Sequence, residues 1–268
     1  MIDSYPQRIV CLTEETTETL YLLGEQQRIV GISGFTVRPP EARKEKPKVS
    51  AFTSAKIEKI LELRPDLVLG FSDIQADIAA ELVRRGIEVH VFNQRSVAEI
   101  LRMILMLGGM IGCEDKPGTL VDKLQAGLDA IRAEASKLPH HPRVYFEEWD
   151  NPQISCIAWV SELIGIAGGE DIFPELAKEP LGKNRIVRDP AEVIRRQPDI
   201  ILGSWCGKKF RPEQVAARPG WQAISAVRTG ELHEVKSSLI LQPGPAALTD
   251  GVEALQRVFR RWSQAHSR

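Results

Sequence analysis

The chain is divided by the stretch Lys116–Leu138, which reads KPGTLVDKLQAGLDAIRAEASKL. Its apolar residues recur every three or four positions, which predicts an amphipathic helix about 30 Å long. These residues are Leu120, Leu124, Leu128 and Ile131. Pro117 suits the first turn of a helix, and Pro139 ends it. The halves of the chain on either side of this helix have similar sequence patterns.

One pattern occurs in both halves. Ile57–Phe71 reads IEKILELRPDLVLGF, and Pro190–Trp205 reads PAEVIRRQPDIILGSW. In each copy an amphipathic helix ends before Pro-Asp, and the continuous apolar run that follows is typical of a strand buried on both faces of a parallel sheet. We therefore predict two α/β lobes with parallel sheets, residues 1–113 and 140–268, joined by a single bridging helix over 114–139.

Two segments between the regular patterns are predicted to be loops. Residues 33–54 are rich in Pro, Lys and Arg and show no period, which predicts a long loop, and such loops tend to be functional. Residues 143–147 predict the first strand of the second lobe, with a loop over 148–152. A closing helix is expected over 245–266.

The amino-acid composition of the chain argues against nucleic acid as a binding partner and against a membrane-spanning segment. In 268 residues, 35 Lys and Arg balance 36 Asp and Glu, so the chain has no electrostatic footprint for nucleic acid. No apolar run approaches the roughly 18 residues of a membrane span. The N-terminal sequence MIDSYPQRIVCLTEE lacks the basic and apolar regions of a signal peptide. As written, the chain is expected in the cytoplasm, or in the periplasm if a leader has been removed.

Aromatic side chains gather where the predicted strands end. Ligands of parallel sheets bind beyond the carboxyl ends of the strands, so these rings predict a cleft between the lobes for a flat or bulky apolar ligand. The alternative is that each ring covers the top of its own sheet. Including Trp159 at the start of a predicted helix, the candidate ligand-binding residues are Phe35, Phe52, Phe71, Trp149, Trp159 and Trp205.

Acidic side chains lie at the same strand ends. Glu14 and Glu15 follow the first strand, and Glu147, Glu148 and Asp150 follow its counterpart in the second half. Carboxylates there could bind a cation or the amide and hydroxyl groups of a ligand. The more ordinary interpretation is that they are solvated loop charges or helix N-terminal carboxylates, which the helix dipole favours.

Signatures of enzymes are absent from the sequence. There is no Gly-x-Gly-x-x-Gly after a strand, no phosphate loop and no Gly-x-Ser-x-Gly. No catalytic residue, catalytic cofactor or metal ligand is therefore predicted. The four cysteines form no Cys-x-x-Cys pair and are expected to be small buried residues. The alternative is that Cys206 is a nucleophile whose thiolate is favoured by Lys208 and Lys209.

Several local sequences carry a family resemblance. They include RIVCLT at 8–13, VSAF at 49–52, LRPDLVL at 63–69 and GGEDIF at 168–173. With the two half-similar lobes and the single helix, the chain resembles the helical-backbone class of ABC-transporter substrate-binding proteins, which bind cobalamin, haem or ferric siderophores. Among its members, the chain is most similar to the periplasmic cobalamin-binding ones.

The resemblance implies a monomeric, non-enzymatic protein that holds cobalamin or another corrinoid between its lobes, for uptake through an ABC permease or for intracellular handling. Haem and ferric siderophores are the alternatives. Siderophore oxygens would require cationic donors, which Arg38, Arg185, Lys208 or Lys209 could supply. In this family a surface glutamate on each lobe docks onto the permease. Glu58 matches the first, while the second position falls on Ala191, with Glu192 one step along.

Overall fold

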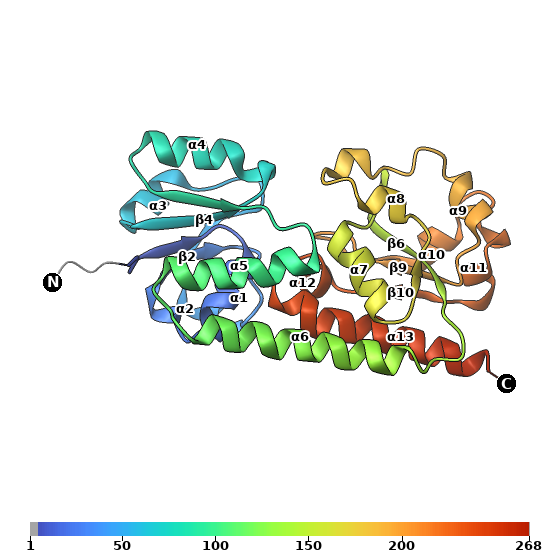
Figure 1. Cartoon of the computed structure of the whole chain (residues 1–268). Helices are drawn as coiled ribbons and strands as arrows, with labels where there is room; N and C mark the ends of the chain where they lie inside the picture. The colour runs from blue at the N-terminus through green and yellow to red at the C-terminus, as the bar shows by residue number, and fades with distance from the viewer. Residues whose placement is uncertain (1–4, 268) are drawn as a thin grey trace. The chain divides into compact units, whose positions relative to one another are not determined.

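The structure, a computed structural model, describes residues 5–267. The first four residues of the predicted first lobe and the last residue of the second lie outside this range. The chain forms two compact units. Unit 1 contains the residues up to Gln94 together with Ala98–Lys123, and unit 2 contains Arg95–Val97 together with the chain from Leu124 onward. Each unit is an α/β lobe (Figure 1), so the predicted fold class is confirmed.

Unit 1 is built on a five-stranded parallel sheet in the order β3-β2-β1-β4-β5. Its strands are β1 Ile9–Cys11, β2 Ile29–Ser33, β3 Lys48–Ser50, β4 Leu67–Phe71 and β5 Val89–Phe92. In β1 and β4 all residues are buried, as expected for strands that helices cover on both faces. Because the strands are parallel, all five carboxyl ends lie at one edge of the sheet.

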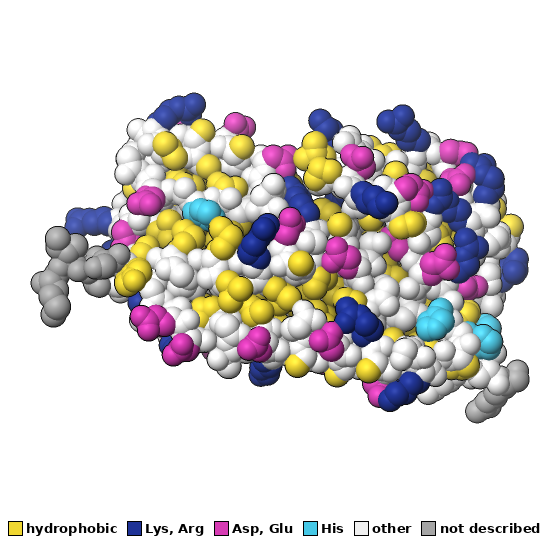
Figure 2. Space-filling model, viewed as in Figure 1, with side chains coloured by type: hydrophobic (Ala, Val, Ile, Leu, Met, Phe, Trp, Pro, Cys, Tyr) yellow, Lys and Arg dark blue, Asp and Glu magenta, His cyan; other side chains and the backbone are white. Residues whose placement is uncertain are grey.

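The helices of unit 1 cover both faces of this sheet (Figure 1). They are α1 Glu14–Leu22, η1 Gln26–Arg28, α2 Pro40–Glu45, α3 Ile57–Glu62, η2 Asp73–Gln75, α4 Ala76–Arg84 and most of α5 Val97–Met110. Ile60 of α3 and Leu82 of α4 pack on Val10 and Val68 to form a buried core. On the outer side of α5, Leu105 and Met106 are exposed, and Figure 2 shows hydrophobic side chains gathered over this helix.

The prediction that residues 33–54 form one long loop is wrong, because the segment contains α2 and β3. Pro40 occupies the first turn of α2, where its missing N–H costs nothing. The strand β3 has only three residues, of which Val49 and Ser50 are buried. Pro47 directly precedes this short strand, and the surrounding residues have the composition of a loop, so the sequence pattern did not reveal it.

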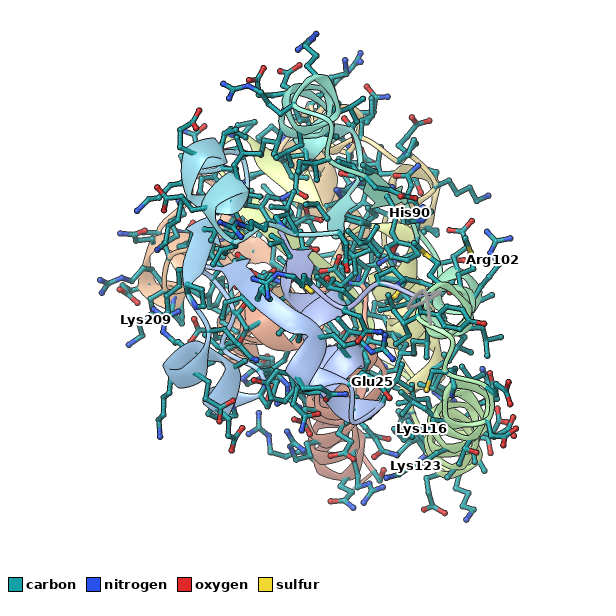
Figure 3. All side chains as sticks on the ribbon, turned by 90° about the vertical axis from the view of Figure 1, so that its left-hand side faces the viewer. Glu25, His90, Arg102, Lys116, Lys123 and Lys209 are labelled. Carbon is teal, nitrogen blue, oxygen red and sulfur yellow. The ribbon has the colours of Figure 1, made fainter. Side chains whose placement is uncertain are left out.

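The predicted bridging helix is α6, Lys116–Ala135, and the division between the units falls within it, after Lys123. Lys116 fastens its first turn to unit 1. The Lys116 Nζ donates hydrogen bonds to Leu23 O at 3.0 Å and to Glu25 Oε1 at 3.1 Å (Figure 3). Burial raises the pKa of Glu25, but hydrogen bonds from Arg28 and Lys116 outweigh it and leave the pKa below its ordinary value.

Unit 2 is built on a second sheet in the order β10-β9-β6-β7, with β8 also paired to β6. Its strands are β6 Arg143–Asp150, β7 Gln153–Ser155, β8 Glu170–Asp171, β9 Ile200–Gly203 and β10 Leu232–Glu234. β8, β6, β9 and β10 are parallel, whereas β7 is antiparallel. The predicted loop over 148–152 is therefore wrong, because β6 continues to Asp150 and turns back into β7.

Helices also cover the sheet of unit 2. They are α7 Ala158–Ile166, α8 Pro174–Ala177, η3 Gly182–Asn184, α9 Ala191–Arg196, α10 Pro212–Ala216, η4 Trp221–Ala223, α11 Ser225–Thr229, α12 Ser237–Ile240, the π-helical η5 Ala247–Gly251 and α13 Val252–Ala265. One core contains Tyr145 and Ile201 of the sheet with Val193 and Trp221 of the helices. Within residues 5–267, no helix is long and apolar enough to cross a membrane.

Candidate functional site

In unit 1, a single buried side chain connects the ends of three strands. Gln75, which is fully buried, accepts a hydrogen bond from the N–H of Phe71 at 2.9 Å through its Oε1. Its Nε2 donates to Leu12 O at 3.3 Å and to Phe52 O at 3.0 Å. Leu12 follows β1, Phe52 follows β3 and Phe71 ends β4, so Gln75 fixes the backbone at this edge of the sheet. Sequence analysis missed Gln75, since no local pattern distinguishes it from an ordinary helix residue.

The aromatic candidates of unit 1 differ in exposure. Phe35 follows β2 and is 53% exposed, whereas Phe52 is half-buried. Phe71 is 4% exposed and belongs to the buried face of β4. All three lie at the carboxyl edge of one sheet, as their positions in the sequence suggested. Phe35 and Phe52 offer the accessible ring surface, while Phe71 lies behind it.

Two carboxylates begin α1 at the same edge. Glu14 and Glu15 occupy its first turn, as predicted, but they are 4% and 1% exposed and are therefore not solvated. Ser33 Oγ donates to Glu14 Oε1 at 3.1 Å, and Thr13 Oγ1 donates to Glu15 Oε1 at 2.6 Å. Burial and the neighbouring Glu14 charge raise the pKa of Glu15 to about 8. Burial also raises the pKa of Glu14.

In unit 2, Glu147 near the carboxyl end of β6 is also fully buried. Its carboxylate accepts two hydrogen bonds from Arg218, at 2.6 and 2.8 Å. It also accepts one from Trp205 Nε1 at 3.0 Å and one from the Tyr145 hydroxyl at 3.1 Å. The guanidinium of Arg218 in turn lies 4.5 Å from the ring centroid of Trp221. This carboxylate is therefore a paired structural charge, and the prediction that it is solvated is wrong.

The two tryptophans that follow β6 and β9 are placed differently. Trp205 is 3% exposed and packs edge-to-face on Phe210, with ring centroids 5.0 Å apart. Trp149 is half-buried, and its Nε1 donates to Asn151 O at 2.9 Å. Lys208 Nζ lies 4.2 Å from the centroid of the Trp149 ring and also pairs with Asp150. Trp149 is thus the more accessible ring of the two.

Trp159, near the start of α7, is 4% exposed. Its Nε1 donates to Ile240 O at 2.9 Å, which joins α7 to α12 within unit 2. The ring is therefore buried, and its indole N–H is bound within unit 2.

Three of the four cations considered for siderophore oxygens, Arg38, Arg185 and Lys208, are engaged with acids, and the fourth, Lys209, is exposed. Arg185 is 3% exposed and donates to both oxygens of Glu148, at 2.7 and 3.1 Å. Arg38 pairs with Glu18 at 3.0 Å, and Lys208 pairs with Asp150. An anionic ligand would have to compete with these carboxylates for the same donors.

The two glutamates considered for permease docking lie on equivalent helices. Glu58 is the second residue of α3, and Glu192 is the second residue of α9. Glu58 is mostly exposed and pairs with Arg85 at 3.1 Å. Glu192 is partly buried and pairs with Arg196 at 3.0 Å and with Arg195. Both glutamates therefore lie in the first turn of their helices, although Glu192 is one residue nearer to its Pro-Asp pair than Glu58 is.

The cysteines are not all buried. Cys11 and Cys156 are buried, Cys113 is intermediate and Cys206 is exposed, so the prediction of burial is wrong for Cys206. It lies in the segment after β9 rather than within the sheet, which explains its exposure. Among the described residues, no group of three or more His, Cys, Asp or Glu side chains could hold a metal ion.

Among the residues that the structure describes, two cavities of unit 1 have linings that do not include the candidate aromatic residues. One, of about 580 Å³, lies against α1 and α2 and includes Glu18, Tyr21 and Arg38. The other, of about 530 Å³, lies between β5 and α5. Its lining includes His90 and Arg102, both labelled in Figure 3. Burial lowers the pKa of His90, which favours the neutral imidazole.

Comparison with known proteins gives matches over nearly the whole chain. Residues 9–239 match a family described as periplasmic binding protein. The chain is 27% identical over 263 residues to an uncharacterised ABC transporter substrate-binding lipoprotein of Bacillus subtilis, covering 95% of this chain and 80% of the relative. It is 25% identical over 259 residues to a cobalamin-binding protein of Halobacterium salinarum. This match covers 91% of this chain and 67% of the relative.

A solved structure gives a similar match. The periplasmic heme-binding protein of Roseiflexus, in its apo form, has a TM-score of 0.78 at 24% identity, over 94% of this chain and 98% of that one. A likeness at this level of identity shows the fold.

Proposed function

The chain belongs to the periplasmic binding protein family, and we propose that it is an ABC-type substrate-binding protein whose ligand is cobalamin or another corrinoid. The ligand is held at the carboxyl edges of the two sheets without covalent chemistry. The exposed ring surface at these edges carries the proposal, namely Phe35, Phe52 and Trp149. Buried Phe71, Trp159 and Trp205 support the walls of the site from behind.

A corrinoid suits these edges for two physical reasons. Its broad, partly apolar ring system buries aromatic surface, which is the main source of affinity in such sites. Arg185 and Lys208 of unit 2 are paired with acids, so an anionic siderophore that used these two donors would have to break those pairs at a cost in free energy. The cobalamin-binding relative supports the choice of ligand.

Tryptophan fluorescence tests this proposal directly. Titration of the purified chain with cyanocobalamin is expected to give saturable quenching with a dissociation constant in the micromolar range or below. Trp149→Ala should weaken binding by about tenfold, because it removes a large apolar contact. Trp262→Ala on α13 is a matched control for quenching, since it removes a tryptophan outside the strand ends. Equal weakening by both variants would contradict the assignment of Trp149.

Haem and ferric siderophores are the alternative ligands of the same site, and the titration distinguishes them when each is added separately. Haem is favoured by the aromatic character of the edges, and it would replace the corrinoid in the proposal if it alone gave saturable quenching.

An enzyme with Cys206 as nucleophile is the alternative of a different class, and the exposure of Cys206 is the observation that favours it. An activated thiolate reacts with iodoacetamide much faster than an ordinary exposed thiol at neutral pH. We expect Cys206 to be labelled at the rate of a free cysteine model compound. A rate 100-fold higher would support the enzyme instead.

The proposed partner is an ABC permease, with Glu58 and Glu192 as the docking residues. Their places in the first turns of α3 and α9, the helices of the repeated pattern, support a docking surface that uses both units. The proposed location is the outer side of the cytoplasmic membrane, and the chain is proposed to act as a monomer. Fractionation of cells that express the natural gene, with detection of this protein in each fraction, tests the location.

A further inference from the structure

The strand ends of unit 1 contain hydrogen-bonding atoms that have no partner within residues 5–267. They include Glu14 Oε2, Glu15 Oε2 and Thr36 Oγ1. All three side chains are buried, with exposures of 4%, 1% and 0%. A buried polar atom without a hydrogen bond costs free energy, so native proteins rarely leave one unmatched unless it has a function.

These atoms belong to one connected region. Glu14 and Glu15 follow β1, and Thr36 follows β2, the neighbouring strand of the sheet. Ser33 links them, because its Oγ donates to Glu14 and its carbonyl accepts from the N–H of Thr36 at 3.2 Å. The unmatched atoms therefore gather at the edge where the proposed ligand is held.

The region has a strong excess of acceptors. Within residues 5–267 neither Glu14 nor Glu15 forms an ion pair with a Lys or Arg. The charges that act on Glu15 come from Glu14 and Glu18, and both disfavour its ionisation. Glu18 itself is paired with Arg38. Above the pKa of Glu15, which is about 8, a ligand that brought hydrogen-bond donors would satisfy these oxygens, whereas one that brought carboxylates would add like charge to a buried acidic region.

We propose that Glu14, Glu15 and Thr36 contact the ligand and select molecules that present amide or ammonium donors over molecules that present carboxylates. This inference rests on the proposed function and names the specificity of that same site. A corrinoid carries primary amide groups around its ring, whereas haem carries two propionates. The selection therefore favours the corrinoid through hydrogen bonds from its amides to the three side chains.

The test compares dissociation constants for cyanocobalamin and haem by isothermal titration calorimetry at pH 9, above the pKa of about 8 at which Glu15 loses its proton. Wild type is expected to bind cyanocobalamin more tightly. In the double variant Glu14→Gln, Glu15→Gln, the cyanocobalamin affinity should fall about tenfold, because charge-assisted hydrogen bonds are lost. The haem affinity should rise, since the like charge is gone. As a result of both changes, the ratio of the haem affinity to the cyanocobalamin affinity should rise by more than tenfold.

Glu62→Gln is the matched control. It removes the same charge from an exposed position at the end of α3, which precedes β4 and so lies toward the amino edge of the same sheet. Its ratio of affinities should equal that of wild type. Thr36→Val, which keeps the shape and removes the hydroxyl, should weaken cyanocobalamin about threefold without changing charge. It provides the test if the double variant does not fold.

The outcomes separate the two proposals. Suppose that wild type binds a ligand, but that the ratio of the cyanocobalamin and haem affinities is the same in the folded double variant as in wild type. The specificity inference is then wrong, while the ligand-binding function stands. An unchanged ratio in Thr36→Val has the same meaning if the double variant does not fold. If wild type binds neither ligand, the proposed function fails and the inference fails with it.

Discussion

At the scale of single residues, the chain uses buried carboxylates in two opposite ways. Glu147 is surrounded by donors, with Arg218, Trp205 and Tyr145 all contributing hydrogen bonds. Glu14 and Glu15 are equally buried but keep unmatched oxygens. In the first arrangement the donors offset the cost of burying a charge in unit 2, and removal of the cation would leave the buried carboxylate uncompensated. The second arrangement leaves carboxylate oxygens at a strand end that are available for hydrogen bonds with a ligand.

Removal of Arg218 tests the role of the Glu147 carboxylate. Arg218→Met should lower the free energy of unfolding by about 3 kcal/mol, because it leaves a buried carboxylate without its cation. Urea denaturation followed by circular dichroism gives this value. Arg260→Met on the exposed side of α13 is the control and should change it by less than about 0.5 kcal/mol. Similar losses in the two variants would mean that the Glu147 pair is unimportant.

The pH dependence of stability tests the burial of Glu15. Its pKa is about 8 in the folded chain against an ordinary value of 4.5, so the folded state binds the extra proton between these values. Its contribution is therefore fully present below about pH 4.5 and is lost as the pH rises to about 8. Glu15→Gln should remove this loss and be more stable than wild type at pH 8, by on the order of 2 kcal/mol.

Urea unfolding of wild type and Glu15→Gln at pH 5, 7 and 9 measures this difference. Glu14 and Glu18 are the charged groups that act on Glu15, and both remain in the variant. Parallel stability profiles for the two proteins would contradict the raised pKa of Glu15.

At the scale of helices and strands, the repeated pattern was predictable because each copy is local. The helix, the Pro-Asp turn and the apolar strand follow one another within about 15 residues, so propensity and periodicity reveal them. β3 and β7 were missed, since each is short and directly follows a proline, Pro47 or Pro152, within a sequence typical of loops. Aromatic candidates could be placed at strand ends from their positions alone. The pairing of Glu147 with Arg218 could not be predicted from the sequence, because these residues are 71 positions apart in the chain.

Close packing at the end of β9 gives a test at this scale. A Cβ added to Gly203 would lie 1.8 Å from Cδ2 of Phe210, whose buried ring contacts Trp205. Gly203→Ala should therefore lower the free energy of unfolding by about 2 kcal/mol through overpacking.

Gly165→Ala is the matched control for that substitution. Gly165 lies in α7, and nothing stands within 4 Å of a Cβ added there. The alanine should stabilise the helix by about 0.5 kcal/mol, because glycine is a poor helix former. Thermal unfolding of both variants supplies the comparison, and destabilisation by Gly165→Ala alone would contradict the described packing.

At the scale of the whole molecule, each unit has its own buried core, and residues from both are proposed to contact one ligand. Ligand that binds only the folded state stabilises whatever it contacts, by about 2.7 kcal/mol at 100 times its dissociation constant. Saturating cyanocobalamin should therefore raise the unfolding temperature of both units, as measured by differential scanning calorimetry. A second transition that stays unchanged on ligand addition would show that one unit takes no part in binding.

The central claim is that this member of the periplasmic binding protein family takes a corrinoid. The most direct measurement is native mass spectrometry of the full chain mixed with equimolar cyanocobalamin, haem and a ferric hydroxamate siderophore. The account predicts one dominant complex, with one cyanocobalamin per chain. A dominant haem or siderophore complex, or a spectrum of the bare chain alone at ligand concentrations of 100 μM, would contradict it.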